Sequence, residues 1–175
     1  PQEYARLQEY FAANDSFSRV LWVPRRHRYG YVADTLLGLT LETLRVASAA
    51  AFPSWLTEDK NKQQLARFSV SHIIVPTDPM GELFVAGERY DGAARQALVA
   101  ALDKDASLER LDILDIAVYK MPFTYGHAFF VENPLVSIDI RKINATHYQI
   151  TLPPVSYERG IIFAETFDPH WTLTF

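Results

Sequence analysis

The order of apolar strand patterns and helix patterns along the chain constrains its fold more than any other feature. Ser18 to Val23 and Val70 to Val75 are apolar, rich in β-branched residues and followed closely by a proline, which is typical of buried strands. Ile113 to Met121 has the same character. Helix patterns lie before and between them, at residues 2–13, 41–51, 58–67 and 92–103. Up to Pro122 this alternation predicts an α/β-like layer with a partly parallel sheet.

Three polar residues mark the expected helix starts. Thr40, Thr57 and Asp91 each precede a helix pattern, and their side chains can accept hydrogen bonds from the first free backbone N–H groups.

The character of the chain changes after Pro122. Four strand patterns follow without a helix between them: Val136 to Ile140, His147 to Leu152, Gly160 to Thr166 and Trp171 to Phe175. They predict an antiparallel sheet or half of a sandwich. The expected fold class is therefore α+β, with an α/β-like subdomain over residues 1–122 and an antiparallel β subdomain over residues 123–175. Because the last strand pattern reaches Phe175, we expect the second subdomain to be truncated there.

Composition excludes several classes of function. The chain has 175 residues, of which 49% are hydrophobic, so it can bury a substantial core. Its net charge of −4 argues against a nucleic-acid partner, and the absence of cysteine excludes disulfides and thiolate-ligated metals. No apolar run reaches the 18 to 20 residues of a spanning helix. The chain opens on Pro1 without a start methionine, so we expect it to be a piece of a longer protein.

No catalytic, metal or cofactor site is predicted. The five histidines are scattered, and His72 lies in a buried strand pattern, as a core histidine would. The glycines are isolated rather than clustered as in a phosphate-binding loop, and there is no Gly-x-Ser-x-Gly motif. Asp112 and Asp115 lie close together, but their placement at a strand entry indicates a polar edge rather than a catalytic pair.

A basic, aromatic segment after the first strand is the main candidate for ligand binding. It contains Trp22, Arg25, Arg26, Arg28 and Tyr29. Guanidinium groups bind phosphate or carboxylate, and aromatic rings stack on sugars, so a sugar phosphate would suit it. The simpler interpretation, which we favour, is a solvated loop whose arginines pair with the protein's own carboxylates.

A second candidate lies near the end of the chain. Glu165 and Trp171 can form a platform on which a sugar stacks. The simpler interpretation, again favoured, is a tryptophan that closes the β core.

Several segments resemble one family in order along the chain. Lys142 to Tyr148 (Lys-Ile-Asn-Ala-Thr-His-Tyr) resembles a K-I-N-P-T-x-Y strand–turn–strand motif, with Ala145 in place of the proline. Glu165 to Trp171 resembles the E-S/T-F/Y-x-P-x-W motif that follows it. Arg19 to Pro24 and His72 to Asp78 are similar to the R-V-L-W-x-P and K-Y-I-I-V-P-x-D segments. These motifs occur in extracytoplasmic regions of prokaryotic membrane glycosyltransferases of the GT-C type, including YfhO-like and arabinofuranosyltransferase-like proteins.

The resemblance implies an extracytoplasmic domain, periplasmic or at the cell surface, tethered to the membrane-embedded remainder of the same polypeptide. It implies a scaffolding or glycan-positioning role in cell-envelope polysaccharide assembly, with a glycan or lipid-linked sugar as partner and no cofactor. It carries over no catalytic residue, because the carboxylates of these enzymes lie beside membrane helices. In this interpretation Asn144 and Thr146 form the turn, and Tyr148 and Trp171 anchor the core with polar tips that need a partner.

Two alternatives remain. A carbohydrate-binding module would expose Trp22, Tyr29, Trp55 or Trp171 as stacking platforms. An independent glycan-acting enzyme would hold paired carboxylates or a histidine–carboxylate pair in a cleft, which nothing in the sequence spacing supports.

Overall fold

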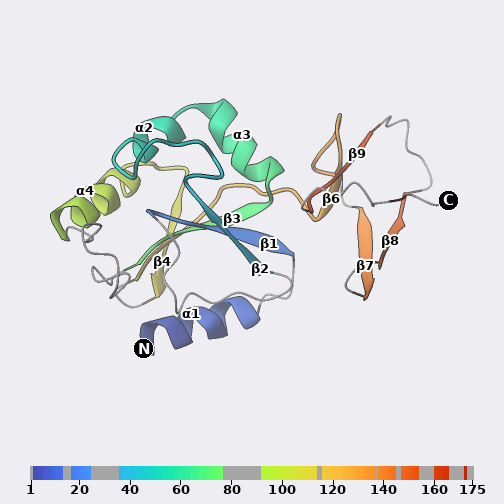
Figure 1. Ribbon diagram of the computed structural model, residues 1–175, viewed down its shortest axis with the longest axis horizontal. Coiled ribbons are helices and arrows are strands. Elements are labelled where there is room, and N and C mark those ends of the chain that lie inside the picture. The colour runs from blue at the N-terminus through green and yellow to red at the C-terminus, as the bar shows by residue number, and fades with distance from the viewer. Residues whose placement is uncertain are drawn as a thin grey trace. The chain divides into compact units, whose positions relative to one another are not determined.

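A computed structural model describes residues 2–13, 17–24, 36–76, 92–113, 116–136, 138–144, 147–153, 160–165 and 172. The fold is α+β (Figure 1). The chain divides into two compact units, Pro1–Thr124 and Tyr125–Phe175, which we call unit 1 and unit 2. The sequence placed this boundary after Pro122.

Unit 1 is built on a mixed five-stranded sheet with the order β2-β1-β3-β5-β4. Strand β1 pairs in parallel with β2 on one side and with the central strand β3 on the other, and β5 pairs antiparallel with both β3 and β4. The parallel part agrees with the expected strand–helix alternation. The strands are β1 (Ser18–Trp22), β2 (Leu36–Thr40), β3 (Val70–Val75), β4 (Glu109–Ile113) and β5 (Ile116–Lys120).

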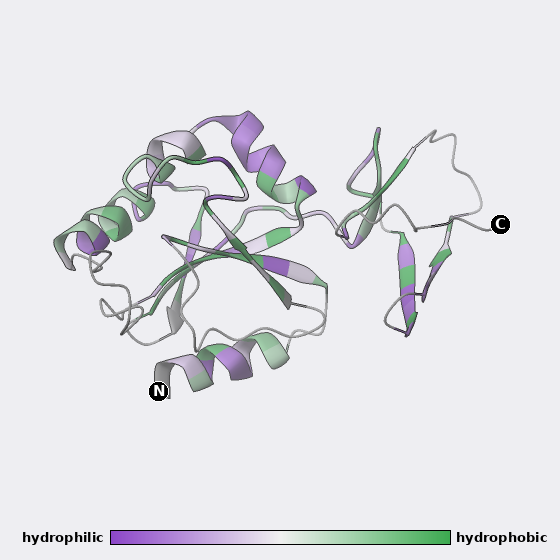
Figure 2. Ribbon diagram, viewed as in Figure 1, coloured by the Kyte–Doolittle hydropathy of each residue, from purple (hydrophilic) through white to green (hydrophobic). Residues whose placement is uncertain are grey.

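Helices cover both faces of this sheet. Figure 1 shows α1 on one face and α2, α3 and α4 on the other. The helices are α1 (Gln2–Ala12), α2 (Phe52–Leu56), α3 (Asp59–Arg67) and α4 (Gly92–Leu102). Figure 2 shows the outer helix α3 coloured hydrophilic over much of its length, as expected for a helix that buries only one side.

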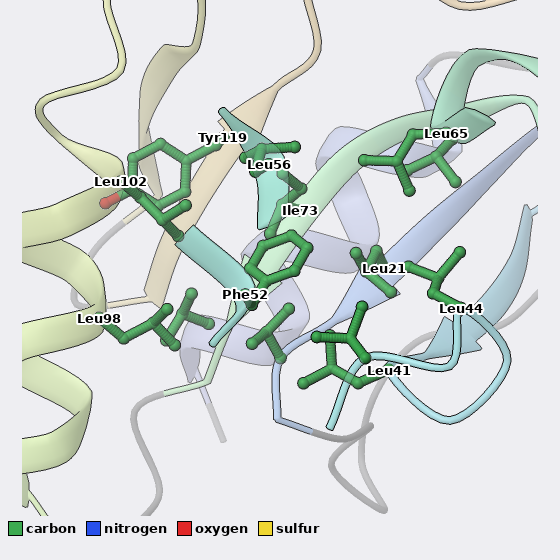
Figure 3. Packing of buried hydrophobic residues seen from close by; sticks show 14 of the residues in the cluster. Leu21, Leu41, Leu44, Phe52, Leu56, Leu65, Ile73, Leu98, Leu102 and Tyr119 are labelled. Carbon is green, nitrogen blue, oxygen red and sulfur yellow. The ribbon is translucent and has the colours of Figure 1, made fainter. Parts of the chain in front are cut away.

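The two faces of β1 explain why that strand is apolar throughout. Alternate residues of a strand point to opposite faces. Leu21 and Val23 pack into the larger core, between the sheet and the helices α2, α3 and α4. Val20 and Trp22 pack between the sheet and α1. Figure 3 shows the larger core, where side chains from the sheet, from the segment after β2 and from α2, α3 and α4 meet.

The expected helix over residues 41–51 is wrong. Thr40 is the last residue of β2, and residues 41–45 form turns that end at Arg45, whose φ is 57°. The spacing of Leu41 and Leu44 resembled a helix face, but these side chains are buried from a turn beside the sheet. A short helix, α2, begins only at Phe52, with Pro53 in its first turn, where a missing N–H costs nothing.

Two further elements of unit 1 differ from expectation. The sequence predicted a single strand over residues 113–121. In the structure β4 ends at Ile113, and a second strand, β5, follows it and pairs with it in antiparallel fashion. Helix α3 begins after Glu58 rather than Thr57, whose Oγ1 donates a hydrogen bond to the Ser54 carbonyl. The cap expected at Asp91 lies outside the described residues.

Unit 2 contains two antiparallel strand pairs. β6 (Ala128–Phe130) pairs with β9 (Ile161–Phe163), and β7 (Asp139–Asn144) pairs with β8 (His147–Thr151). A small core joins the pairs: Ala128, Phe130 and Ile138 are buried, with Val136, Ile140, Ile150 and Phe163 packed against them. Strand β7 begins three residues later than expected, and the expected last strand, Trp171 to Phe175, lies outside the described residues except for Thr172.

Candidate functional site

Trp22, a predicted ligand-binding residue, is fully buried. It packs between α1 and the sheet, so its ring offers no face to a sugar and the prediction of a stacking role is wrong. Its indole Nε1 is also buried and has no hydrogen-bond partner among the described residues. Trp22, the last residue of β1, belongs to the core because helices cover both faces of this strand.

The predicted arginine segment lies outside the described residues, as do all four of its remaining members and Trp171. The strand that leads into it is described. At its end the Val23 N–H donates to the Ile74 carbonyl at 2.9 Å, which places the carboxyl ends of β1 and β3 side by side. There Arg95 Nε donates to the Pro76 carbonyl at 2.7 Å.

Trp55 is half-buried rather than open on the surface. Its ring stacks on that of Phe52, with centroids 5.9 Å apart and planes at 24°. One face of the indole is therefore covered by the protein.

Glu165 is the one predicted site residue that the structure places in a cluster of polar side chains. Its Oε1 accepts a hydrogen bond from the Tyr148 hydroxyl at 3.0 Å and lies 2.9 Å from His127 Nε2. Because an ionised carboxylate has no proton to donate, His127 is the donor in this contact. We call Glu165, His127 and Tyr148 the Glu165 cluster.

Strand pairing explains how residues distant in sequence meet. Ala128 lies opposite Phe163 in the β6–β9 pair, and the Ala164 N–H donates to the His127 carbonyl at 2.7 Å. This register brings His127 beside Glu165. Tyr148 comes from β8 in the other strand pair, so the cluster ties together both strand pairs of unit 2.

Aromatic rings surround the carboxylate. The His127 ring stacks on Phe163, with centroids 4.9 Å apart, and meets Tyr148 edge to face at 5.2 Å. Lys142 Nζ lies over the Tyr148 ring, 5.8 Å from its centroid. The side chains of His127 and Glu165 are 9% and 17% exposed, so the pair is sheltered but reachable from solvent.

The cluster supplies an oriented hydrogen-bond acceptor. Both described donors bind Oε1, and no described residue donates to Oε2. The histidine–carboxylate contact is the kind of pair that the enzyme alternative predicts. The sequence pointed to Glu165 but not to His127, since the two are 38 residues apart and no short spacing links them.

His72 is a satisfied core histidine, as the sequence predicted. The Ser71 hydroxyl donates to the Arg19 carbonyl at 3.3 Å and so can accept from His72 Nδ1 at 2.8 Å. The Tyr10 hydroxyl lies 3.1 Å from Nε2 and can donate to it. This pattern places the ring proton on Nδ1. Burial, and then the charge of Lys120, lower the pKa of His72 to about 4.

The described residues reveal no metal centre: none of their His, Asp and Glu side chains form a group of three or more suited to a metal ion. The side chains of Asp112 and Asp115 lie outside the description. No helix in the described part of the chain is both long enough and apolar enough to cross a bilayer.

Comparison of the whole chain with protein-family models, curated proteins and solved structures gives no match.

Proposed function

We propose that this chain is a non-catalytic extracytoplasmic domain of a membrane glycosyltransferase-like protein. There it scaffolds the protein or positions a glycan during cell-envelope polysaccharide assembly. Its partners are the membrane-embedded remainder of the same polypeptide and a glycan or lipid-linked sugar.

The observation that carries the proposal is the hydrogen bond between Tyr148 and Glu165. Tyr148 ends the first motif on which the resemblance rests, and Glu165 begins the second. In the structure these motif residues bond to each other. Motif residues that serve the domain's own architecture are expected of a scaffold, whereas those of an enzyme would be directed at a substrate.

Unit 1 is consistent with the same role. Strands β1 and β3 carry apolar side chains into two buried cores. Polar side chains after α4 and on β4 and β5 bond to one another. Asp103, for example, accepts from Arg110 at 2.8 Å and from the Tyr119 hydroxyl at 2.8 Å. These contacts hold α4 to the sheet.

One observation favours an independent glycan-acting enzyme, namely the contact between His127 and Glu165. Glycoside hydrolysis uses two carboxyl groups that flank the scissile bond. The hydrogen-bonded cluster described here contains a single carboxylate, and its Oε1 is engaged by two internal donors. The scaffold interpretation therefore accounts for more of the cluster.

Cysteine labelling tests the proposed location, because the chain has no cysteine of its own. Leu135 is 77% exposed and Val118 is fully buried. In the full-length protein in intact cells, a membrane-impermeant maleimide should label Leu135→Cys but not Val118→Cys. Labelling of Leu135→Cys only after the cells are lysed would place the domain in the cytoplasm and refute the proposal.

A further inference from the structure

Glu165 Oε2 accepts no hydrogen bond from a described residue, whereas Oε1 accepts two. Oε1 takes hydrogen bonds from His127 and Tyr148, which fixes the position of the carboxylate. Oε2 is not one of the buried polar atoms that lack a partner, and the side chain is 17% exposed. Oε2 is therefore an acceptor that no described donor engages, held in place by two bonds on its neighbour.

We propose that Glu165 Oε2 is a contact point for hydroxyl groups of a neutral glycan. This inference rests on the proposed function and assigns the place in unit 2 where the glycan is bound. A carboxylate held by a histidine and a tyrosine needs no reorganisation to accept a hydroxyl proton, and hydrogen bonds to charged acceptors are the stronger ones.

The surroundings select among ligand classes. The negative charge of Glu165 repels phosphate, so the site takes a neutral sugar rather than the phosphate of a sugar phosphate. The Lys142 ammonium lies over the Tyr148 ring, 5.8 Å from its centroid. The rings of His127, Tyr148 and Phe163 pack against one another beside the carboxylate, and aromatic rings are the groups on which the C–H faces of a sugar rest.

Substitutions at two positions test the binding contact. Glu165→Gln can keep its carbonyl oxygen toward His127 and Tyr148 while placing an NH₂ group where Oε2 was, which turns the acceptor into a donor. Glu165→Asp keeps the charge but withdraws the carboxylate by one methylene. Glu132→Gln makes the same change at an exposed glutamate of unit 2 outside the Glu165 cluster, so it serves as the matched control.

The experiment is an NMR titration of the isotope-labelled 175-residue chain. The probes are methyl pyranosides and furanosides and neutral oligosaccharides at millimolar concentration, with glucose 1-phosphate and choline chloride as comparators. We expect saturable shifts at the amides of Phe163, Ala164 and Glu165 with at least one neutral sugar. Affinity should fall by about tenfold or more in Glu165→Gln and Glu165→Asp, and by less than about threefold in Glu132→Gln.

Several results would overturn the inference. They are a flat response to every neutral sugar, equal binding by wild type and both Glu165 variants, or shifts produced by choline or glucose 1-phosphate alone. The amide spectrum of each variant shows whether it is folded. If Glu165→Gln is unfolded, the affinity of Glu165→Asp decides whether Glu165 contacts the sugar. A flat titration together with outside labelling of Leu135→Cys would reject the glycan site and leave the scaffold proposal intact.

Discussion

The Tyr148 hydroxyl donates a hydrogen bond to Glu165 Oε1 over 3.0 Å and so connects strand β8 to the segment just beyond β9. Tyr148 lies in the β7–β8 pair, and Glu165 lies two residues after β9, whose partner is β6. Among the described residues of unit 2, Ala128, Phe130 and Ile138 form the buried centre of its core. The hydrogen bond adds a polar tie between the strand pairs to this apolar one.

The low pKa of His72 predicts a loss of stability in mild acid. The pKa is about 4 in the folded chain, against 6.5 for an ordinary histidine. Between these values the unfolded chain binds a proton that the folded chain does not. The free energy of unfolding should therefore fall by up to ~1.4 kcal/mol per pH unit as the pH drops from 6.5 toward 4, with no further loss from this group below 4.

Urea unfolding at several pH values across this window measures the effect. His72→Gln should flatten the pH dependence of stability. Identical slopes for wild type and His72→Gln would show that His72 titrates normally.

Tyr119 should contribute to stability through its hydroxyl and make the fold sensitive to alkali. The hydroxyl donates to Asp103 Oδ1 at 2.8 Å and lies 3.2 Å from the Val99 carbonyl. Tyr119→Phe should lower the free energy of unfolding by about 1–2 kcal/mol at neutral pH. A change below the error of the urea midpoint would contradict this role.

Burial, followed by the hydrogen bond and charge of Asp103, also raises the pKa of Tyr119 well above its ordinary value of 10. Above pH 10 the unfolded chain releases the phenol proton first, so wild-type stability should fall as the pH rises. Alkaline titration of stability should show a shallower fall in Tyr119→Phe. Equal falls would assign the effect to other groups.

The burial of Trp22 predicts a structural rather than a binding role. Trp22→Ala removes a fully buried ring below α1 and should cost about 3–5 kcal/mol of unfolding free energy. Leu135→Ala, at a residue 77% exposed, should change it by less than about 0.5 kcal/mol. Thermal or urea unfolding compares the two, and a Trp22→Ala protein of unchanged stability would show that the ring is not in the core.

The sequence predicted those elements whose local pattern agrees with their tertiary environment. α1, β1, β3, α4 and β8 lie within one residue of their expected ends, because each combines a clear period with a nearby proline, glycine or turn. The strand β2 was missed because Leu36–Thr40 is short and contains Gly38, and only its pairing with β1 makes it a strand. The helix expected over residues 41–51 is absent at its start because Leu41 and Leu44, although three residues apart as on a helix face, are buried from turns.

The candidate site was foreseen only in part. Glu165 stood out by its motif, but the residue expected to accompany it, Trp171, lies outside the described residues. His127 had no signal, because the β6–β9 register that brings it to Glu165 depends on pairing across 38 residues. The sequence predicted an exposed Trp22 because a strand end next to arginines resembles a binding loop. That segment alone does not indicate that α1 buries the ring.

A double-mutant cycle on Tyr148 and Glu165 tests most directly the central claim that the two motif segments are joined by these side chains. Tyr148→Phe, Glu165→Ala and the double variant are unfolded in urea, and the amide signals of β6 and β8 report on unit 2. The structure predicts a coupling free energy of about 1 kcal/mol in favour of the pair. Additive effects, with coupling below about 0.3 kcal/mol, would contradict the claim.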